Sequence, residues 1–418
     1  MLKRITAIAF IFACTSVAWI ILGGTIFTRT YSSDAISQNR VTSTWGAPQN
    51  QAPPSASFKT IVTRKQETIE NNKNTTKTVQ EEVTTELPLE SSSIDVRLDL
   101  EHRQKGLLWY STYTVAFQGE YGFRNPSDQD QLVNFTLKFP TSQAIYDDLA
   151  ITVDGVAAPI TNHDNMATAP VRIAAGKTAQ LRVGYRSQGL NEWRYSFGSS
   201  NVAQVRDFNL RMRTNFKEID FPDNTLSPSQ KRENGSGWDL GWSYSNLLSG
   251  YQIAMVMPEK LQPGPLAGKI SLFAPVSLFF FFFVMFIITA LRGIELHPMN
   301  YFFLAAAFFS FHLLLAYLVD HVSIHVAFAI SAAVSVFLVV SYLRLVVGMR
   351  FASREAALAQ FIYLVMFSYA FFIEGFTGLA ITIGSVLTLF VVMQVTGRIR
   401  WAEKFALKQP EAKVQQVG

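Results

Sequence analysis

Cysteine is almost absent from this chain. The 418 residues include one cysteine, Cys14, which lies in an apolar run near the N-terminus. A single cysteine excludes an intrachain disulfide and any metal site built from several cysteines. Any folded domain of this chain must therefore be held together without disulfides, by packing alone.

Motifs of the common enzyme classes are missing as well. The sequence has no Walker A motif, no G-x-G-x-x-G fingerprint and no H-E-x-x-H zinc motif. Residues 235–237, Gly-Ser-Gly, lack the G-x-S-x-G spacing of a nucleophile elbow. These absences argue against an enzyme, and we predict no catalytic residue, no metal and no cofactor.

Charged residues are missing from six long stretches. None of these stretches contains Asp, Glu, Lys or Arg. An α-helix of about 20 apolar residues spans the hydrocarbon core of a bilayer. The predicted spans are residues 5–27, 272–291, 299–318, 322–343, 356–373 and 376–396. The sequence thus predicts a multi-pass α-helical membrane protein with one N-terminal span and five C-terminal spans.

Lysine and arginine are also missing from alternate connections. The turns that hold Asp320 and Glu374 contain neither residue type, whereas the other connections are basic. Basic loops remain in the cytoplasm, which places residues 1–4 and 397–418 there and residues 28–270 on the other side. The residues that fix this topology and contact anionic lipid are Arg292, Arg344, Arg350, Arg354, Arg398 and Arg400. The basic connections and tail assigned to the cytoplasm account for the net charge of +5, so this charge indicates no nucleic-acid partner.

Large apolar side chains are scarce between residues 28 and 90. This segment is rich in Ser, Thr, Asn, Gln, Glu and Lys, and Phe58 and Ile61 are among its few larger apolar residues. Such a composition buries too little apolar surface to offset the entropy of ordering. We therefore predict a polar stalk, although the alternation over 57–64 and 78–85 would also suit a hairpin of edge strands.

Apolar and polar residues alternate through residues 91–268, as they do in β-strands. Ile94, Val96 and Leu98 alternate with polar residues, and Asp154-Gly155 is typical of a tight hairpin turn. Many short strands separated by turns indicate an antiparallel sandwich or jelly roll. The complete predicted fold is therefore six spans with a large all-β domain inserted after the first.

The predicted β domain carries two weaker signals of chemistry. Trp193, Trp238 and Trp242 would line a sugar or peptide cleft if exposed, but alternation places Trp193 and Trp242 in the core. Carboxylates would be needed for a hydrolytic acid and base, yet solvated carboxylates are common in loops. The available ones are Glu192, Asp207, Asp220, Asp223 and Asp239.

Five segments near the C-terminus form a recognisable pattern. They are residues 293–301 (Gly-Ile-Glu-Leu-His-Pro-Met-Asn-Tyr), 307–317 (Ala-Phe-Phe-Ser-Phe-His-Leu-Leu-Leu-Ala-Tyr), 320–321 (Asp-His), 341–344 (Ser-Tyr-Leu-Arg) and 396–401 (Thr-Gly-Arg-Ile-Arg-Trp). Together they resemble the inner-membrane protein CreD family. The resemblance implies a Gram-negative inner-membrane protein with a periplasmic β-rich domain and a link to envelope stress. The family offers no established catalytic residues, and its frequent acidic pair is reduced here to Glu374.

Histidine is the residue type within the predicted spans that can change its charge near neutral pH. His312 lies in the middle of the span 299–318. An ionisable group at bilayer depth is costly and therefore marks a candidate proton or ligand site. The structural alternative is a neutral imidazole that is hydrogen-bonded to a neighbouring helix.

A second polar group lies at the ends of the spans. His321 and His325 are four residues apart, so on a helix they share one face and would bind a metal with Asp320. Polar residues at a membrane boundary also occur without such a role, so we predict no metal. Glu374 lies in another external turn, near Asp320 if the bundle brings these turns together. Glu295 and His297, which precede Pro298, are expected to cap the helix that follows them.

These observations predict a CreD-like protein that acts in envelope stress or envelope integrity. We expect the lipid bilayer as one partner and a periplasmic protein or cell-wall glycan as the other, bound by the β domain. One alternative is a small transport or proton-coupled module that uses His312, Asp320 and Glu374, and another is a periplasmic hydrolase. The sequence leaves the oligomeric state open.

Overall fold

The protein consists of two compact units. The structure, a computed structural model, describes residues 2–70, 73–198 and 203–397. We call the described residues of 1–34, 106–108 and 261–418 the membrane unit, and those of 35–105 and 109–260 the β unit. This division confirms the predicted fold class, in which a β-rich domain lies between one N-terminal span and five C-terminal ones.

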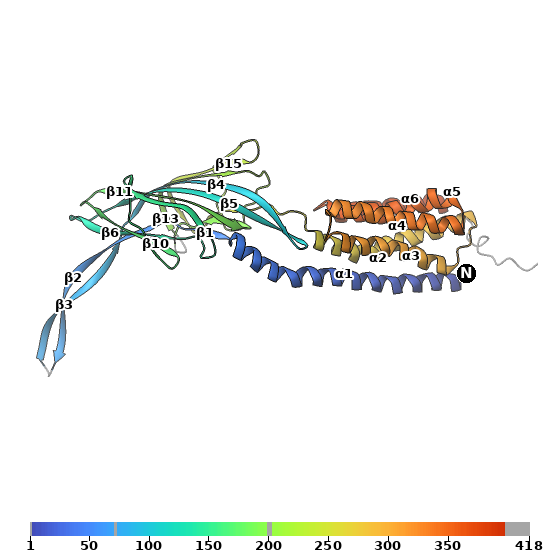
Figure 1. Cartoon of the computed structure of the whole chain (residues 1–418), viewed down its shortest axis with the longest axis horizontal. Helices are drawn as coiled ribbons and strands as arrows, with labels where there is room; N and C mark the ends of the chain where they lie inside the picture. Colours follow the sequence, from blue (N-terminus) through green and yellow to red (C-terminus); the bar gives the residue numbers. More distant parts are fainter. Residues whose placement is uncertain (1, 71–72, 199–202, 398–418) are drawn as a thin grey trace, which may run out of the picture. The chain divides into compact units, whose positions relative to one another are not determined.

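Six helical segments among the described residues are long and apolar enough to cross a membrane (Figure 1). They are Arg4–Ser32 within α1 (Leu2–Trp45), α2 (Pro263–Arg292), α3 (Pro298–Leu318), α4 (Ile324–Val346), the segment Met349–Phe372 and α8 (Thr377–Thr396). The fifth segment comprises α5 (Met349–Phe351), η1 (Ala352–Ala356), α6 (Ala357–Gln360), η2 (Phe361–Met366), α7 (Phe367–Tyr369) and η3 (Ala370–Phe372). Its η1 and η2 parts are π-helical turns, so its backbone is wider than that of a regular α-helix.

Single residues explain where α2 ends and α3 begins. Gly293 follows α2 with φ 66°, a left-handed conformation that favours glycine, and its N–H donates to carbonyls of the last turn. Pro298 is the first residue of α3, where a missing N–H costs little. The side chain of His297 accepts a hydrogen bond from the N–H of Met299 at 3.2 Å, which confirms the cap predicted for His297. Glu295, the other predicted cap, makes no hydrogen bond to another described residue.

Aromatic side chains fill the core of the membrane unit. Trp19, Phe281, Tyr301, Phe308 and Phe311 are all fully buried there. In α8, by contrast, the one buried residue is Thr388. This last helix therefore packs on the others over a small part of its surface.

Three sheets make up the β unit. The eight-stranded sheet has the order β14-β15-β13-β4-β5-β11-β7-β8, the five-stranded sheet β3-β2-β6-β10-β9, and the three-stranded sheet β1-β12-β16. The strands are β1 (Gln49–Gln51), β2 (Ser55–Glu70), β3 (Lys73–Glu86), β4 (Leu89–Lys105), β5 (Leu108–Arg124), β6 (Gln131–Lys138), β7 (Tyr146–Val153), β8 (Val156–Ala157), β9 (Thr161–His163), β10 (Met166–Ile173), β11 (Thr178–Leu190), β12 (Glu192–Tyr195), β13 (Ala203–Thr214), β14 (Gln230–Glu233), β15 (Trp238–Ser249) and β16 (Ile253–Val256). Most neighbours are antiparallel, but β13 runs parallel to β4 and β1 runs parallel to β12.

The predicted alternation is confirmed in the eight-stranded sheet. Ile94, Val96 and Leu98 of β4 are buried in a core to which the five-stranded sheet also contributes. Asp154 and Gly155, between β7 and β8, have φ values of 50° and 80°, as a tight hairpin turn with two left-handed residues requires. The polar residues between the buried ones point away from the core, and they form an outer face of this sheet.

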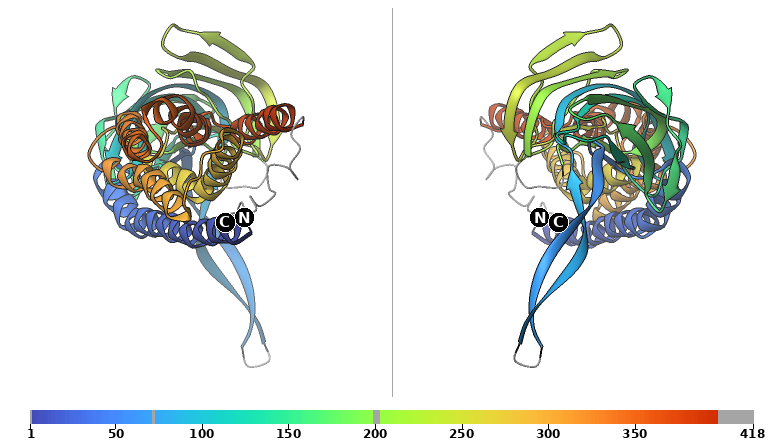
Figure 2. Two further views of the ribbon diagram at one scale, coloured as in Figure 1. Left: turned by 90° about the vertical axis from the view of Figure 1, so that its right-hand side faces the viewer. Right: turned by 90° about the vertical axis from the view of Figure 1, so that its left-hand side faces the viewer.

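The range 28–90 is more regular than a polar stalk. Helix α1 continues to Trp45, and β2 pairs with β3 from Ser57 opposite Glu86 to the far end of the hairpin. Figure 2 shows this ribbon extending away from the rest of the β unit. Phe58 is 5% exposed at its base whereas Ile61 is 71% exposed, so only the base packs on the core. The structure therefore has the hairpin that the alternating residues also allowed.

Candidate functional site

A hollow of 560 Å³ lies on the outer face of the eight-stranded sheet. The alternation of strands β4, β5, β11 and β13 places polar side chains there. They include Asp95, Gln118, Glu120, Arg182, Asn209 and Arg211. Gly184 of β11 and Ala150 of β7 also line the hollow, and because one has no side chain and the other only a methyl group, they leave its space unfilled. A Cβ atom at Gly184 would meet no atom closer than 3.8 Å, so this glycine keeps the surface low rather than avoiding a clash.

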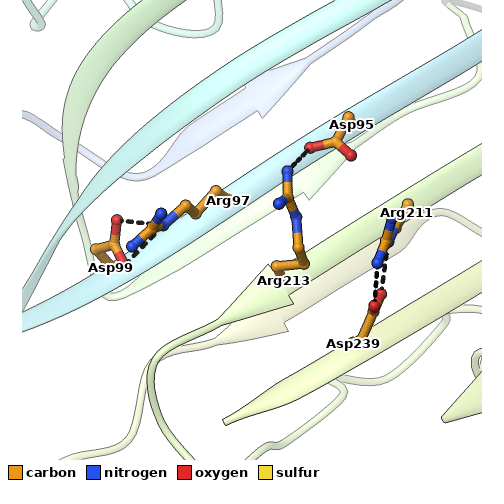
Figure 3. Close-up of polar contacts among 6 residues, drawn as sticks. All are labelled: Asp95, Arg97, Asp99, Arg211, Arg213 and Asp239. Atoms are coloured by element: carbon orange, nitrogen blue, oxygen red, sulfur yellow. Dashed lines mark hydrogen bonds and ion pairs between the residues drawn. The ribbon is translucent and has the colours of Figure 1, made fainter. Parts of the chain in front are cut away.

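The charged residues around the hollow are paired across strands (Figure 3). Arg211 of β13 donates from Nε to Asp239 of β15 at 2.8 Å, and Arg213 pairs with Asp95 of β4. The hydrogen bond from Arg211 is the main reason that the pKa of Asp239 lies below its usual range. Each guanidinium therefore neutralises a carboxylate, and these pairs add no net charge to the surface.

The charged and the uncharged polar side chains of the hollow differ in whether they have partners. Among the charged ones, Arg182 Nη2 and Glu120 Oε1 pair at 3.2 Å, which leaves the lining without net charge. Four hydroxyl and amide side chains, by contrast, make no hydrogen bond to another described residue. They are Ser93, Gln118, Thr152 and Asn209. The hollow thus offers neutral donors and acceptors to a ligand.

His312 is fully buried in the membrane unit. Its ring lies among Trp19, Phe308 and Phe311, with centroid distances of 5.8, 5.8 and 4.9 Å. Nδ1 is 3.2 Å from the Phe308 carbonyl oxygen, to which a protonated Nδ1 donates. Nε2 has no hydrogen-bond partner among the described residues. His312 and Phe308 both belong to α3, so this hydrogen bond lies within one helix. The structural alternative from the sequence had instead expected a hydrogen bond to a neighbouring helix.

Sequence reasoning missed a second buried polar group. Ser335 of α4 donates to the Ala307 carbonyl of α3 at 2.6 Å, and Gln360 of α6 donates from Nε2 to Ser335 Oγ at 2.9 Å. The Gln360 Oε1 atom is buried and finds no partner in the part of the chain that is described. Gln360 also lies between the two π-helical turns, which occur frequently at functional sites. Gln360 could have been identified from the sequence, because it is a single amide within the apolar stretch 356–373.

Asp320 ties two helices together. Arg29 of α1 pairs with Asp320 at 3.3 Å and donates from Nη2 to the Ala316 carbonyl at 2.6 Å. The same guanidinium lies 5.3 Å from the ring centroid of Tyr317. A cation at the C-terminus of α3 also compensates the unpaired carbonyls of its last turn. These contacts are those of a structural residue at the membrane boundary, which is the role that the sequence favoured for Asp320 over one in transport or metal binding.

The other candidates near the span ends are His321, His325 and Glu374, and in the described residues none of them makes a direct polar contact with Asp320. His321 is exposed, and the ring of His325 lies 5.2 Å from that of Phe372. Glu374 is exposed and has no hydrogen bond or ion pair with another described residue. Among the described residues, no three His, Cys, Asp or Glu side chains form a group that could hold a metal ion.

Comparison with protein families decides the affiliation of the chain. The family model described as inner membrane protein CreD matches residues 1–402. This chain belongs to the CreD family. The match covers both units, so the family accounts for the β-rich domain as well as for the membrane helices. No curated protein matches the chain.

Solved structures resemble this CreD-family chain only distantly. A putative nutrient binding protein from Legionella pneumophila subsp. pneumophila str. Philadelphia 1 is 10% identical, with a TM-score of 0.33, over 56% of this chain and 76% of its own. An M1 zinc metallopeptidase from Deinococcus radiodurans is 12% identical, with a TM-score of 0.24, over 41% of this chain and 42% of its own. TM-scores this low support no conclusion about fold or activity.

The basic residues of this CreD-family chain differ in their partners. Arg292, at the end of α2, pairs with Glu355 of η1, so these two segment ends lie together. Arg344, Arg350 and Arg354 are exposed and have no hydrogen bond or ion pair with another described residue. The remaining predicted topology residues, Arg398 and Arg400, lie outside the described residues.

Proposed function

We propose that this CreD-family protein supports envelope integrity by binding a cell-wall glycan on its β unit. The observation that carries the proposal is the polar hollow, whose charges are paired and whose amides and hydroxyls are unused. Sugar hydroxyls both donate and accept hydrogen bonds, as do the Asn and Gln side chains. A ligand without net charge suits a surface on which each guanidinium is already neutralised.

The predicted topology supports this location. The β unit follows the first span and precedes the second, whereas the basic connections follow the second and fourth spans. If those basic connections are cytoplasmic, the β unit is periplasmic and faces the cell wall. The contact between Arg292 and Glu355 agrees with this assignment because it brings two of these segment ends to the same side of the bundle.

Removal of two free amides tests the proposal. Each lost hydrogen bond to a ligand costs about 1 kcal/mol, so Gln118→Ala with Asn209→Ala should weaken binding roughly 30-fold. The measurement is calorimetric titration of the full chain in nanodiscs with soluble peptidoglycan fragments. Cells that carry this variant should also lose as much survival under a cell-wall antibiotic as cells without the protein.

The same sheet offers a matched control. Gln204 of β13 donates to Asn246 of β15 at 3.3 Å, and neither residue lines the hollow. The variant Gln204→Ala with Asn246→Ala removes the same two side-chain types and should bind like the wild type. Equal loss in both variants, or an absence of binding by the wild type, would contradict the proposal.

Buried unpartnered polar atoms favour a second candidate, a proton-coupled module in the membrane unit. His312 Nε2 and Gln360 Oε1 are buried and without partners among the described residues. Intramembrane groups of this kind commonly mark ion or proton paths. This candidate predicts proton flux in liposomes that contain the protein, abolished by His312→Phe and retained in the control His325→Phe. Flux no greater than that of empty liposomes would exclude it and leave the binding function.

A further inference from the structure

A long apolar groove runs through the membrane unit beside α8. It has a volume of 1050 Å³ and is lined by α2, by the segment Met349–Phe372 and by α8. The α8 residues that line it run from Ala380 to Val395, roughly 22 Å of helix at 1.5 Å per residue. All three elements are candidate membrane spans, so the groove lies at bilayer depth. An apolar groove at that depth is filled by apolar chains rather than by water.

The groove exists because α8 touches the bundle at few points. Thr388 Oγ1 and Tyr363 Oη form a hydrogen bond of 2.9 Å, and a Cβ atom at Gly384 would come within 2.8 Å of the Phe367 ring. These two contacts lie one helical turn apart on α8. Along the remainder of the helix the side chains of the bundle do not close the space, and a bound chain would complete the packing.

One end of the groove carries an available positive charge. Arg354 and Glu355 are its two charged lining residues. Glu355 is already paired with Arg292, whereas Arg354 is exposed and pairs with no other described residue. The guanidinium of Arg354 can therefore accept an anion, and a phosphate matches its fork of N–H donors.

The length of the groove restricts the chain that fits it. The hydrocarbon core of a bilayer is about 30 Å thick, so an acyl chain of an ordinary phospholipid reaches about 15 Å, to the midplane. The groove extends beyond that depth. We infer that it binds a polyisoprenyl phosphate, with the phosphate at Arg354 and the isoprenoid chain along α8. This inference is independent of glycan binding by the β unit.

Lipid binding to the full chain tests the inference. The protein would be titrated with undecaprenyl phosphate in detergent micelles and the complexes counted by native mass spectrometry. We expect Arg354→Ala to weaken binding about tenfold or more, because a charged hydrogen bond is lost. Arg350→Ala is the matched control, since Arg350 is also exposed and unpaired among the described residues but does not line the groove.

A second pair of variants tests the groove itself. Ala380→Phe places a ring in the groove and should weaken binding, whereas Leu379→Phe, at a neighbouring exposed position, should not. Equal binding of phosphatidylglycerol would overturn the choice of a long isoprenoid chain. The inference also fails if wild-type protein retains no lipid, if a second protein copy occupies the groove, or if Arg350→Ala weakens binding as much as Arg354→Ala does.

Discussion

Above pH 10 the β unit is expected to unfold over a narrow pH range. Four of its tyrosines, Tyr113, Tyr121, Tyr185 and Tyr195, are no more than 3% exposed. Burial raises the pKa of each phenol above the ordinary value of 10. In the unfolded chain these groups ionise near pH 10, whereas in the folded chain they keep their protons. The contribution of these protonated phenols to the free energy of unfolding is therefore fully present below pH 10, and it is lost as the pH rises towards the pKa values of the folded state.

The size of this effect follows from proton linkage. Each phenol that stays protonated only in the folded state removes about 1.4 kcal/mol of stability per pH unit. Four such groups remove about 5.6 kcal/mol per pH unit, which is comparable to the whole stability of many domains at about 5–15 kcal/mol. The measurement is alkaline titration of the full chain in nanodiscs, followed by tyrosinate absorbance and near-ultraviolet circular dichroism. Both signals should change together.

Tyr121→Phe provides the control for this titration. Phenylalanine keeps the ring and removes one ionisable hydroxyl. The dependence of stability on pH above 10 should then fall by about 1.4 kcal/mol per pH unit. Tyr185→Phe should give the same reduction but also lose the hydrogen bond of 2.6 Å to Gln51 Oε1, so its stability at neutral pH should be lower. Gradual tyrosinate formation in a folded β unit would contradict the prediction.

Local patterns in the sequence predicted the elements but not their partners. The alternation of Ile94, Val96 and Leu98 predicts a strand with one buried face, because successive side chains point to opposite faces. The same pattern does not indicate that β4 pairs in parallel with β13, which places Leu210 beside Ile94. That pairing depends on packing between distant parts of the chain, and short-range periodicity carries no information about it.

In the membrane unit, too, the local sequence indicated single polar residues but not the contacts between distant ones. His312 was found from sequence because an imidazole stands out in an apolar run. Gln360 is equally buried but was missed, since its contact with Ser335 appears only when α4 and α6 lie together. Arg29 reaches the Ala316 carbonyl across 287 residues of sequence. That contact, together with the ion pair to Asp320, could not be predicted from the order of residues.

Trp242→Ala is expected to destabilise the β unit by about 3–5 kcal/mol, because it deletes a large buried side chain and leaves a cavity. Trp242 of β15 is fully buried in the core, and its indole Nε1 donates to the Leu226 carbonyl at 2.8 Å. The substitution also leaves that carbonyl without this donor, which adds to the cost of the cavity. The full chain in nanodiscs would be measured by pulse proteolysis at increasing urea concentration.

Trp238, four residues earlier on the same strand, is the matched control. Its indole Nε1 also donates to a carbonyl, that of Lys217, at 2.8 Å, but its ring is only partly buried and lies under Lys231 Nζ at 4.2 Å. Trp238→Ala therefore loses a similar hydrogen bond with much less buried area, and it should cost about 1–2 kcal/mol. Equal losses for the two variants would show that the hydrogen bond rather than burial dominates.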